Sequence, residues 1–255
     1  SAHMATYVLA GDVGGTKTAL AIYVLEQASH ISLVREARFA SQAYSSLEMV
    51  VGEFLQQGRE VITASAFGVP GPVLDGEAQI TNLPWRVSAS KLALATKCTR
   101  VRLMNDLETT AYGSLFLPPD QLVTLNPGKV RSGHRAIIAA GTGLGQAFLF
   151  WDGVRYWPAA TEGGHVDFAP RSDQETALLS FLRTQYGRVS CERVITGPGL
   201  VNIFNFLTQE QQKAPTITVR DRMQSEDPAA VIGKAGIEQQ CPTCSEAVEL
   251  FLSAY

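Results

Sequence analysis

Short apolar runs separated by glycine turns open the chain. One apolar run spans Tyr7 to Ala10, the glycine turn spans Gly11 to Gly15, and a second apolar run spans Ala19 to Val24. A third run lies near Ile31 to Phe39. Runs of this length with glycine between them predict a three-stranded meander.

Helices and strands are predicted to alternate after the meander. Apolar residues recur at helical spacing from Ser46 to Gln57, and Ser46 is of a type that often caps helices. The same criteria predict a strand at 61–69, a helix at 88–96, a strand at 100–104 and a helix at 105–115. This alternation is typical of a mixed sheet with crossover helices.

Two segments, the proline-containing Leu117 to Asp120 and the polar stretch Asn126 to His134, separate this part from a second one with a similar start. The apolar run Ile137 to Ala140, the turn Gly141 to Gly145 and the run Ala147 to Trp151 repeat the strand, glycine turn and strand of the amino terminus. A third strand is predicted at 154–158, followed by helices at 175–186, 199–206, 218–223, 228–233 and 245–255. We therefore predict an α/β chain with a small lobe at 5–114 and a large lobe at 115–255.

The second lobe lacks the later strands that the repeat leads us to expect. The last residues, SEAVELFLSAY, are apolar almost all round and stop without a capping glycine, which is typical of a helix buried within a core. We therefore expect the second lobe to be incomplete at its carboxy terminus. At the other end, Ser1 to His3 ahead of Met4 are typical of an extension added by an expression vector.

Composition excludes several classes of protein. A chain of 255 residues with 45% hydrophobic content can bury a substantial core, and its net charge of -3 comes without a basic stripe, which excludes nucleic acid as an expected partner. The first apolar stretch is too short and too broken by glycine for a signal peptide or a membrane span. We expect a cytoplasmic protein with no membrane partner, and a homodimer is among the assemblies that the sequence allows.

Of the four cysteines, only Cys241 and Cys244 have CxxC spacing. A zinc site needs two further ligands, and neither a second CxxC nor a nearby HxxxH follows. We interpret the pair as two thiols on a helix surface.

The segment GDVGGTKT, residues 11–18, has the features of a phosphate-binding hairpin. Its glycines allow backbone N–H groups to approach phosphate oxygens, and Asp12 could face a magnesium ion. It is not a P-loop, because Thr16 rather than glycine precedes Lys17, and no GxGxxG opens a helix. An ordinary tight hairpin with a solvated Lys17 is the alternative.

The segment AAGTGLG, residues 139–145, repeats this glycine hairpin and adds the hydroxyl of Thr142.

In MNDLETTAYG, residues 104–113, Asn105 and Asp106 stand at a predicted strand-to-helix junction, where the helix start stabilises a carboxylate. Asp106 is our candidate general base, and a plain helix cap is the alternative.

Two further segments carry polar residues suited to sugar hydroxyls. EGGHVDFAP, residues 162–170, places Glu162 and His165 around two glycines, so that one turn offers both acceptors and donors. CERVITGPGL, residues 191–200, contributes Glu192 and then a glycine-rich helix start that could face a nucleotide.

Taken together, the two glycine hairpins followed by strands resemble the hexokinase and actin-like ATPase superfamily. NDL, EGGH and the following glutamate resemble the bacterial glucokinases outside the repressor-type kinase group, in order over nearly the whole chain. The resemblance implies two ribonuclease H-like lobes with a central cleft, and glucose and ATP as small-molecule partners with Mg2+. TNLPW, residues 81–85, is similar to the family's small-lobe loop at the cleft. The family also has a carboxy-terminal adenosine-binding segment that has no counterpart here, and this departure puts adenine binding in doubt.

The resemblance also implies roles for individual residues, with Asp106 as the catalytic base. The residues that match glucose contacts are Asn105, Asp106, Glu162, His165 and Glu192. The residues expected at ATP and its metal are Asp12, Gly14, Gly15, Thr16, Gly141, Thr142 and Gly143, with Asp12 facing the metal. Two alternatives stay open: a sugar-binding protein without turnover, and an actin-like ATPase or chaperone.

Overall fold

The computed structural model describes residues 6–27 and 30–255, which divide into two compact units. Unit 1 comprises Ser1–His134 and Leu149–Ala160, and unit 2 comprises Arg135–Phe148 and Thr161–Tyr255. The predicted vector extension lies outside the described residues. The lobe boundary between residues 114 and 115 stays a prediction.

Unit 1 is built on a five-stranded sheet with the order β3-β2-β1-β4-β7. Its strands are β1 (Thr6–Val13), β2 (Lys17–Gln27), β3 (His30–Ala40), β4 (Ile62–Val69) and β7 (Val101–Asn105). The first three pair antiparallel and confirm the predicted meander, whereas β4 lies parallel to β1 and β7 lies parallel to β4. The carboxyl ends of β1, β4 and β7 therefore share one edge of the sheet.

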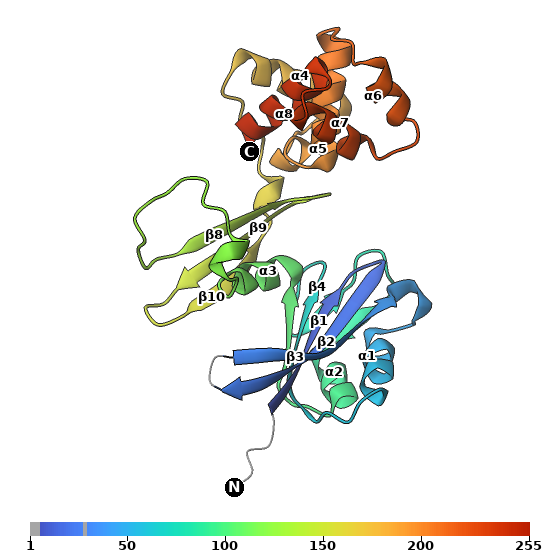
Figure 1. Ribbon diagram of the computed structural model, residues 1–255, viewed down its shortest axis with the longest axis vertical. Helices are drawn as coiled ribbons and strands as arrows, with labels where there is room; N and C mark the ends of the chain where they lie inside the picture. The colour runs from blue at the N-terminus through green and yellow to red at the C-terminus, as the bar shows by residue number, and fades with distance from the viewer. Residues whose placement is uncertain (1–5, 28–29) are drawn as a thin grey trace. The chain divides into compact units, whose positions relative to one another are not determined.

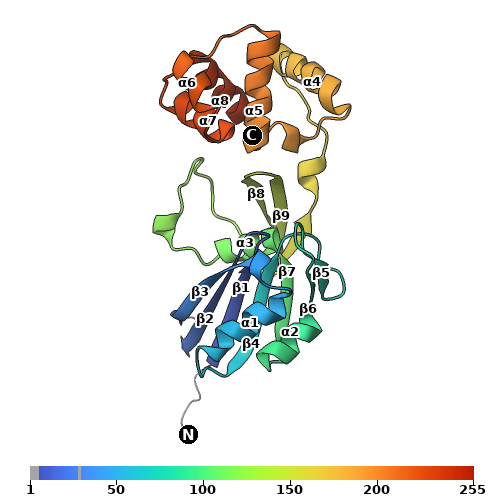
Figure 2. The same cartoon turned by 90° about the vertical axis from the view of Figure 1, so that its right-hand side faces the viewer.

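Two helices of unit 1, α1 (Leu47–Gln56) and α2 (Ala89–Thr96), lie across one face of this sheet (Figure 2). The Ser46 hydroxyl accepts from the Met49 N–H and starts α1 as predicted. The apolar face of α1 is buried with sheet residues such as Leu9 and Phe67 in one continuous core. The periodicity that predicted the helix is the periodicity of its buried residues.

A short hairpin of unit 1 was not predicted. It consists of β5 (Glu77–Gln79) and β6 (Arg86–Ser88), and the TNLPW segment forms the connection between them. Trp85 in this connection is 1% exposed, and its indole N–H donates to the Tyr44 carbonyl at 3.0 Å. Its tryptophan therefore anchors the segment to the core.

A second sheet, of order β10-β9-β8, is formed by the strands that the repeated pattern predicted. They are β8 (Arg135–Ala140), β9 (Leu144–Trp151) and β10 (Tyr156–Thr161). Five α-helices follow within unit 2 (Figure 1): α4 (Asp173–Tyr186), α5 (Gly197–Asn205), α6 (Ile217–Arg222), α7 (Pro228–Ile237) and α8 (Pro242–Ala254). They enclose a second hydrophobic core that includes Leu178, Ile203 and Ile232.

Four of these helices begin one to three residues earlier than predicted, and in α5 and α8 the added residues include a proline. The sequence predicted starts at Gly199 and Ser245, but α5 begins at Gly197 and α8 begins at Pro242. Proline is tolerated in the first turn because the N–H groups there have no partner within the helix. Pro198 and Pro242, which lie outside the predicted helix ranges, therefore lie inside the first turns of α5 and α8.

The interpretation of Cys241 and Cys244 as surface thiols is wrong. Both side chains are buried, at 0% exposure, because the start of α8 packs into the core of unit 2. The packing is so close that a Cβ added at Gly236 of α7 would lie 2.6 Å from the Cys244 carbonyl oxygen. Cysteine suits this position as a small apolar residue.

The sequence suggested that the last helix is buried on all sides, but α8 is buried on one side only. Ala247 and Leu250 are buried, whereas Leu252 is 62% exposed. Across residues 6–27 and 30–255, no helix combines the length and the apolar character needed to cross a membrane.

Candidate functional site

The turn between β1 and β2 forms the first glycine hairpin. The Gly14 N–H donates to the Lys17 carbonyl at 2.9 Å, and a Cβ at Gly14 would lie only 2.8 Å from that oxygen. Within the described part of the chain, the N–H groups of Gly15 and Thr16 have no acceptor. The hairpin therefore presents two free donors of the kind that bind phosphate.

Asn105 and Asp106 stand where β7 meets α3 (Asp106–Ser114). Asn105 is the N-cap: its Oδ1 accepts from the Leu107 N–H at 2.9 Å, and its Nδ2 donates to the Gly71 carbonyl at 2.8 Å. The Glu108 carboxylate accepts from the Asn105 N–H at 3.0 Å and completes a capping box. Asp106 is the first helical residue rather than the cap, so its carboxylate is held by the capped turn.

Asp12 and Asp106 lie at the same edge of the sheet. Asp12 of β1 is paired with Gly68 of β4, which is paired with Met104 of β7, two residues before Asp106. Burial, followed by repulsion from the Asp12 carboxylate, raises the pKa of Asp106, although the Leu107 N–H bond opposes this rise. Two carboxylates of unit 1 therefore interact where we predicted a base and a metal ligand.

The second glycine hairpin joins β8 to β9 in unit 2. The Gly141 N–H donates to the Gly143 carbonyl at 2.9 Å, and the Gly197 N–H at the start of α5 donates to the Gly141 carbonyl at 2.9 Å. Among the described residues, the N–H groups of Thr142 and Gly143 have no acceptor. This turn therefore resembles the first in offering free donors, here beside a helix start.

The EGGH segment forms a 3-10 turn over Gly163–His165. A Cβ at Gly164 would lie only 2.0 Å from the Leu144 carbonyl oxygen, so the turn packs directly on the start of β9. The side chains of Glu162 and His165 remain exposed, with His165 Nε2 3.5 Å from the Glu162 carboxylate. Glycine permits a close approach that leaves two polar side chains free.

Glu192 reaches the same strand from the 3-10 turn Cys191–Arg193. Its Oε2 accepts from the Leu144 N–H at 3.0 Å, and the neighbouring Cys191 N–H donates to the Val166 carbonyl at 2.8 Å. Glu192 is thus more than the surface acid that it would be in isolation. The structure brings it together with the EGGH turn around Leu144, within unit 2.

Comparisons with known proteins show the family of this chain. The family model described as Glucokinase matches residues 9–255. The glucokinase of Synechocystis sp. is 37% identical over 99% of this chain and 78% of its own length, and that of Nostoc sp. is 35% identical over 98% and 78%. The chain belongs to the glucokinase family.

The fold of this glucokinase-family chain agrees with solved structures. The crystal structure of a glucokinase from an Antarctic psychrotroph superposes with a TM-score of 0.81 at 25% identity, covering 96% of this chain and 74% of that one. The predicted α/β fold class and the family resemblance are confirmed by these findings. The roles of the individual site residues stay predictions.

Asp227, which lies at a hollow beside the second hairpin, was not among the site residues predicted for this glucokinase-family chain. The hollow has a volume of about 660 Å³ and is lined by both Thr142 and Asp227. Asp227 is the N-cap of α7, where its carboxylate accepts from the Ala230 N–H at 3.3 Å. The signal in the sequence was an aspartate before Pro228, typical of a helix start.

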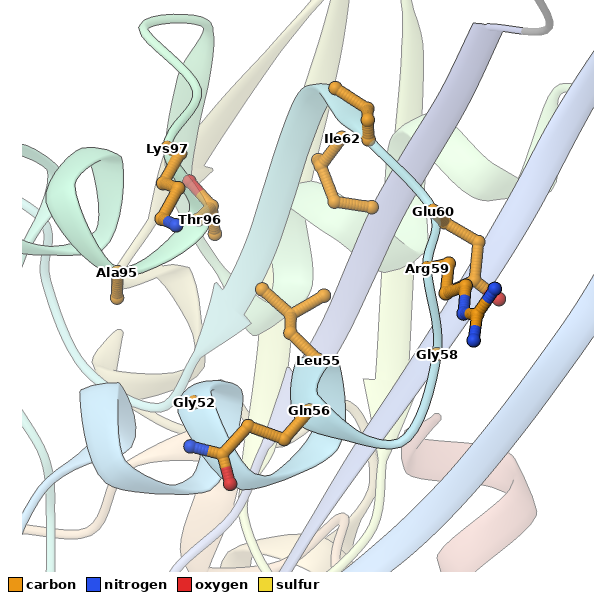
Figure 3. Close-up of a pocket in the computed structure, with 11 residues that line it drawn as sticks. Gly52, Leu55, Gln56, Gly58, Arg59, Glu60, Ile62, Ala95, Thr96 and Lys97 are labelled. Carbon is orange, nitrogen blue, oxygen red and sulfur yellow. The ribbon is translucent and has the colours of Figure 1, made fainter.

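A hollow of about 450 Å³ in unit 1 lies away from the predicted residues (Figure 3). Its walls come from the end of α1, the connection 58–61, the start of β4 and the end of α2. The one carboxylate there, Glu60, is held by Arg35 at 2.9 Å. Because this hollow lies at the amino end of β4, it is at the opposite edge of the sheet from Asp12.

Proposed function

We propose that this chain transfers the γ-phosphate of ATP to the 6-hydroxyl of glucose. Membership of the glucokinase family over residues 9–255 supports the reaction. The single observation that carries the mechanism is the placement of Asp106, a partly buried carboxylate at the carboxyl edge of parallel strands. An attacking hydroxyl needs such a group to accept its proton.

Asp106 acts as the general base. Its raised pKa makes it a stronger acceptor for the hydroxyl proton than an ordinary aspartate, as general base catalysis requires. The capping bonds of Asn105 hold the first turn of α3 and with it the direction of the Asp106 carboxylate. We also propose Asn105 as a glucose contact, in the role that the family resemblance implies.

Glu162, His165 and Glu192 bind hydroxyl groups of the sugar. Carboxylates accept hydrogen bonds from hydroxyls, whereas a neutral imidazole both donates and accepts. Glu162 and His165 are exposed, and only one oxygen of Glu192 is recorded as an acceptor for Leu144. Unit 2 therefore has hydrogen-bonding capacity left for a ligand.

The glycine hairpins bind the phosphate groups of ATP. In unit 1 the contributing residues are Gly14, Gly15 and Thr16, and in unit 2 they are Gly141, Thr142 and Gly143. The free N–H groups of both turns support this role, since backbone donors at a glycine turn bind phosphate oxygens without obstruction.

We propose Asp12 as the residue that holds Mg2+. Among the described residues no group of three or more potential ligands gathers in one place. A single carboxylate fits magnesium nevertheless, because this ion is commonly held by one or two carboxylates together with substrate phosphates and water. When bound, the ion would neutralise charge on the transferring phosphoryl group. We further propose that the protein acts in the cytoplasm, where ATP is available.

A melting experiment tests the sugar assignment. Ligand that binds only the folded state stabilises it by about 2.7 kcal/mol at a concentration a hundredfold above Kd. We expect millimolar glucose to raise the Tm of this chain and the same concentration of galactose to raise it much less. The Glu162→Ala and His165→Ala variants should lose most of the shift. Equal shifts with both sugars, or full shifts in both variants, would contradict the assignment.

A further inference from the structure

Ser41 is a buried residue that forms hydrogen bonds to the first glycine hairpin. It lies directly after β3 and is fully buried, at 0% exposure. Its hydroxyl donates to the Gly14 carbonyl at 2.7 Å, and its backbone N–H donates to the Thr16 carbonyl at 3.0 Å. One buried residue therefore engages two carbonyl groups of the three-residue turn.

Thr18 supports Ser41 in this position. The two hydroxyl oxygens are 2.9 Å apart, and Thr18 is also at 0% exposure. Because the one hydroxyl proton of Ser41 is directed to Gly14, Thr18 is the donor of the pair. The Ser41 carbonyl accepts from the Tyr44 N–H at 3.2 Å, so every polar group of Ser41 has a partner. Partnered buried hydroxyls are fixed in orientation, since any rotation leaves a polar group unsatisfied.

The fixed carbonyl of Gly14 determines where the next N–H points. A trans peptide unit is planar, and its C=O and N–H point in opposite directions. The Gly14 carbonyl is directed at Ser41, so the Gly15 N–H is directed away from Ser41. That N–H is one of the two in this turn that lack an acceptor within the described residues.

We propose that Ser41 is a positioning residue for the nucleotide, which orients the free Gly15 N–H of the Gly14–Thr16 turn toward a phosphate. The role rests on the proposed function, because it takes this turn as a phosphate site. Ser41 acts through Gly14 and Thr16 and does not itself contact the ligand. Donors that are oriented before binding need no reorganisation when the phosphate arrives, and this strengthens their interaction.

The chain offers a matched pair of variants to test this role. Ser41→Ala removes the hydroxyl that donates to Gly14. Ser65→Ala removes another buried serine hydroxyl of unit 1, which is 3% exposed and has no hydrogen-bond partner among the described residues. Calorimetric titration with MgATP and, separately, with glucose then measures both affinities for each variant.

We expect Ser41→Ala to weaken MgATP binding about tenfold and to leave glucose binding within about twofold, whereas Ser65→Ala changes neither. Amide exchange should become faster at Gly14 and at residue 41, whose N–H bonds close the turn. Thr18→Val, which leaves the Gly14 bond in place, should show a smaller loss of MgATP affinity, and Thr18→Ser should restore it. The Thr18 pair provides the same test if Ser41→Ala does not fold.

If the wild-type protein binds MgATP, equal loss of both affinities in Ser41→Ala, or unchanged MgATP binding, would contradict the role of Ser41. The proposed function would not be affected by that result. A Thr18→Val variant with wild-type MgATP affinity and turn exchange would count equally against it. Wild-type protein that binds no MgATP would contradict the proposed function and the role of Ser41 with it.

Discussion

Asp106 is subject to opposing influences at the residue scale. Its place at the start of α3 favours a negative charge, because the helix dipole and the Leu107 N–H stabilise the carboxylate. Burial and the nearby Asp12 disfavour the charge and prevail, so the pKa is raised. A carboxylate that costs stability in the folded protein while providing a stronger base is typical of functional sites.

Replacement of Asp106 by asparagine separates these two effects. Asp106→Asn should reduce phosphoryl transfer by about 10²- to 10⁴-fold, because the proton acceptor is lost, while glucose affinity stays within about tenfold. At neutral pH its Tm should equal or exceed that of the wild type, because the variant no longer buries a charge beside Asp12. Steady-state rates, glucose titration and thermal melting measure the three quantities.

The stability difference between this variant and the wild type should depend on pH with a definite sign. The folded-state pKa of Asp106 lies above the ordinary value of 3.8, so its charge penalises the folded state fully above the folded pKa. As the pH falls through that value the penalty is relieved, and the Tm advantage of Asp106→Asn should shrink toward zero below about pH 4. A variant that is less stable than the wild type at neutral pH would contradict the direction of the shift.

Glycines position the polar side chains at the scale of single elements. Gly164 lets the EGGH turn pack on the Leu144 carbonyl, and Gly68 lets Thr109 of α3 lie against β4, where an added Cβ would be 2.8 Å from the Thr109 hydroxyl. In both contacts the backbone of a glycine lies directly against an atom of a neighbouring element. They set the geometry of the site before any ligand is present.

Gly164→Ala tests this packing. Its Cβ would lie 2.0 Å from a backbone oxygen, which cannot move away as a flexible side chain can. We expect the EGGH turn to shift and glucose affinity to fall about tenfold to a hundredfold, the equivalent of about 1 to 3 kcal/mol of overpacking. Gly128→Ala is the control, because nothing lies within 4 Å of its added Cβ. Unchanged glucose affinity in Gly164→Ala, measured by calorimetry, would remove the turn from the sugar site.

The sequence predicted long periodic elements well and short ones poorly. Helix α1 was predicted from its apolar repeat, and both glycine hairpins were predicted from their composition. The β5–β6 hairpin was missed because three-residue strands are too short to show alternation, and it depends on the anchoring of Trp85. The burial of Cys241 and Cys244 was missed because it depends on the tertiary packing of α8.

The same limit applies to the candidate site. Asp106 was predicted from a strand-to-helix junction, but the repulsion between its carboxylate and that of Asp12 depends on the sheet order that places β1, β4 and β7 side by side. The bond from Leu144 to Glu192 spans 48 positions and has no local signal. Residue types and local turns were predictable, whereas contacts made across the fold were not.

At the scale of the whole molecule, each unit has its own core and its own glycine hairpin. Unit 1 carries the proposed base and the proposed metal ligand, and unit 2 carries Glu162, His165 and Glu192. An actin-like ATPase would need the hairpins but not a set of sugar-binding residues. Dependence of ATP turnover on sugar therefore distinguishes these classes.

The most direct test of glucose phosphorylation is the rate of ADP release from MgATP with and without glucose, together with identification of the phosphorylated product by 31P NMR. We expect ADP release to require glucose, to yield the 6-phosphate ester in equal amount, and to be lost in Asp106→Asn. ATP hydrolysis that is independent of sugar would favour an ATPase. Glucose binding without ester formation would favour a sugar-binding protein, and either result would contradict the proposed function.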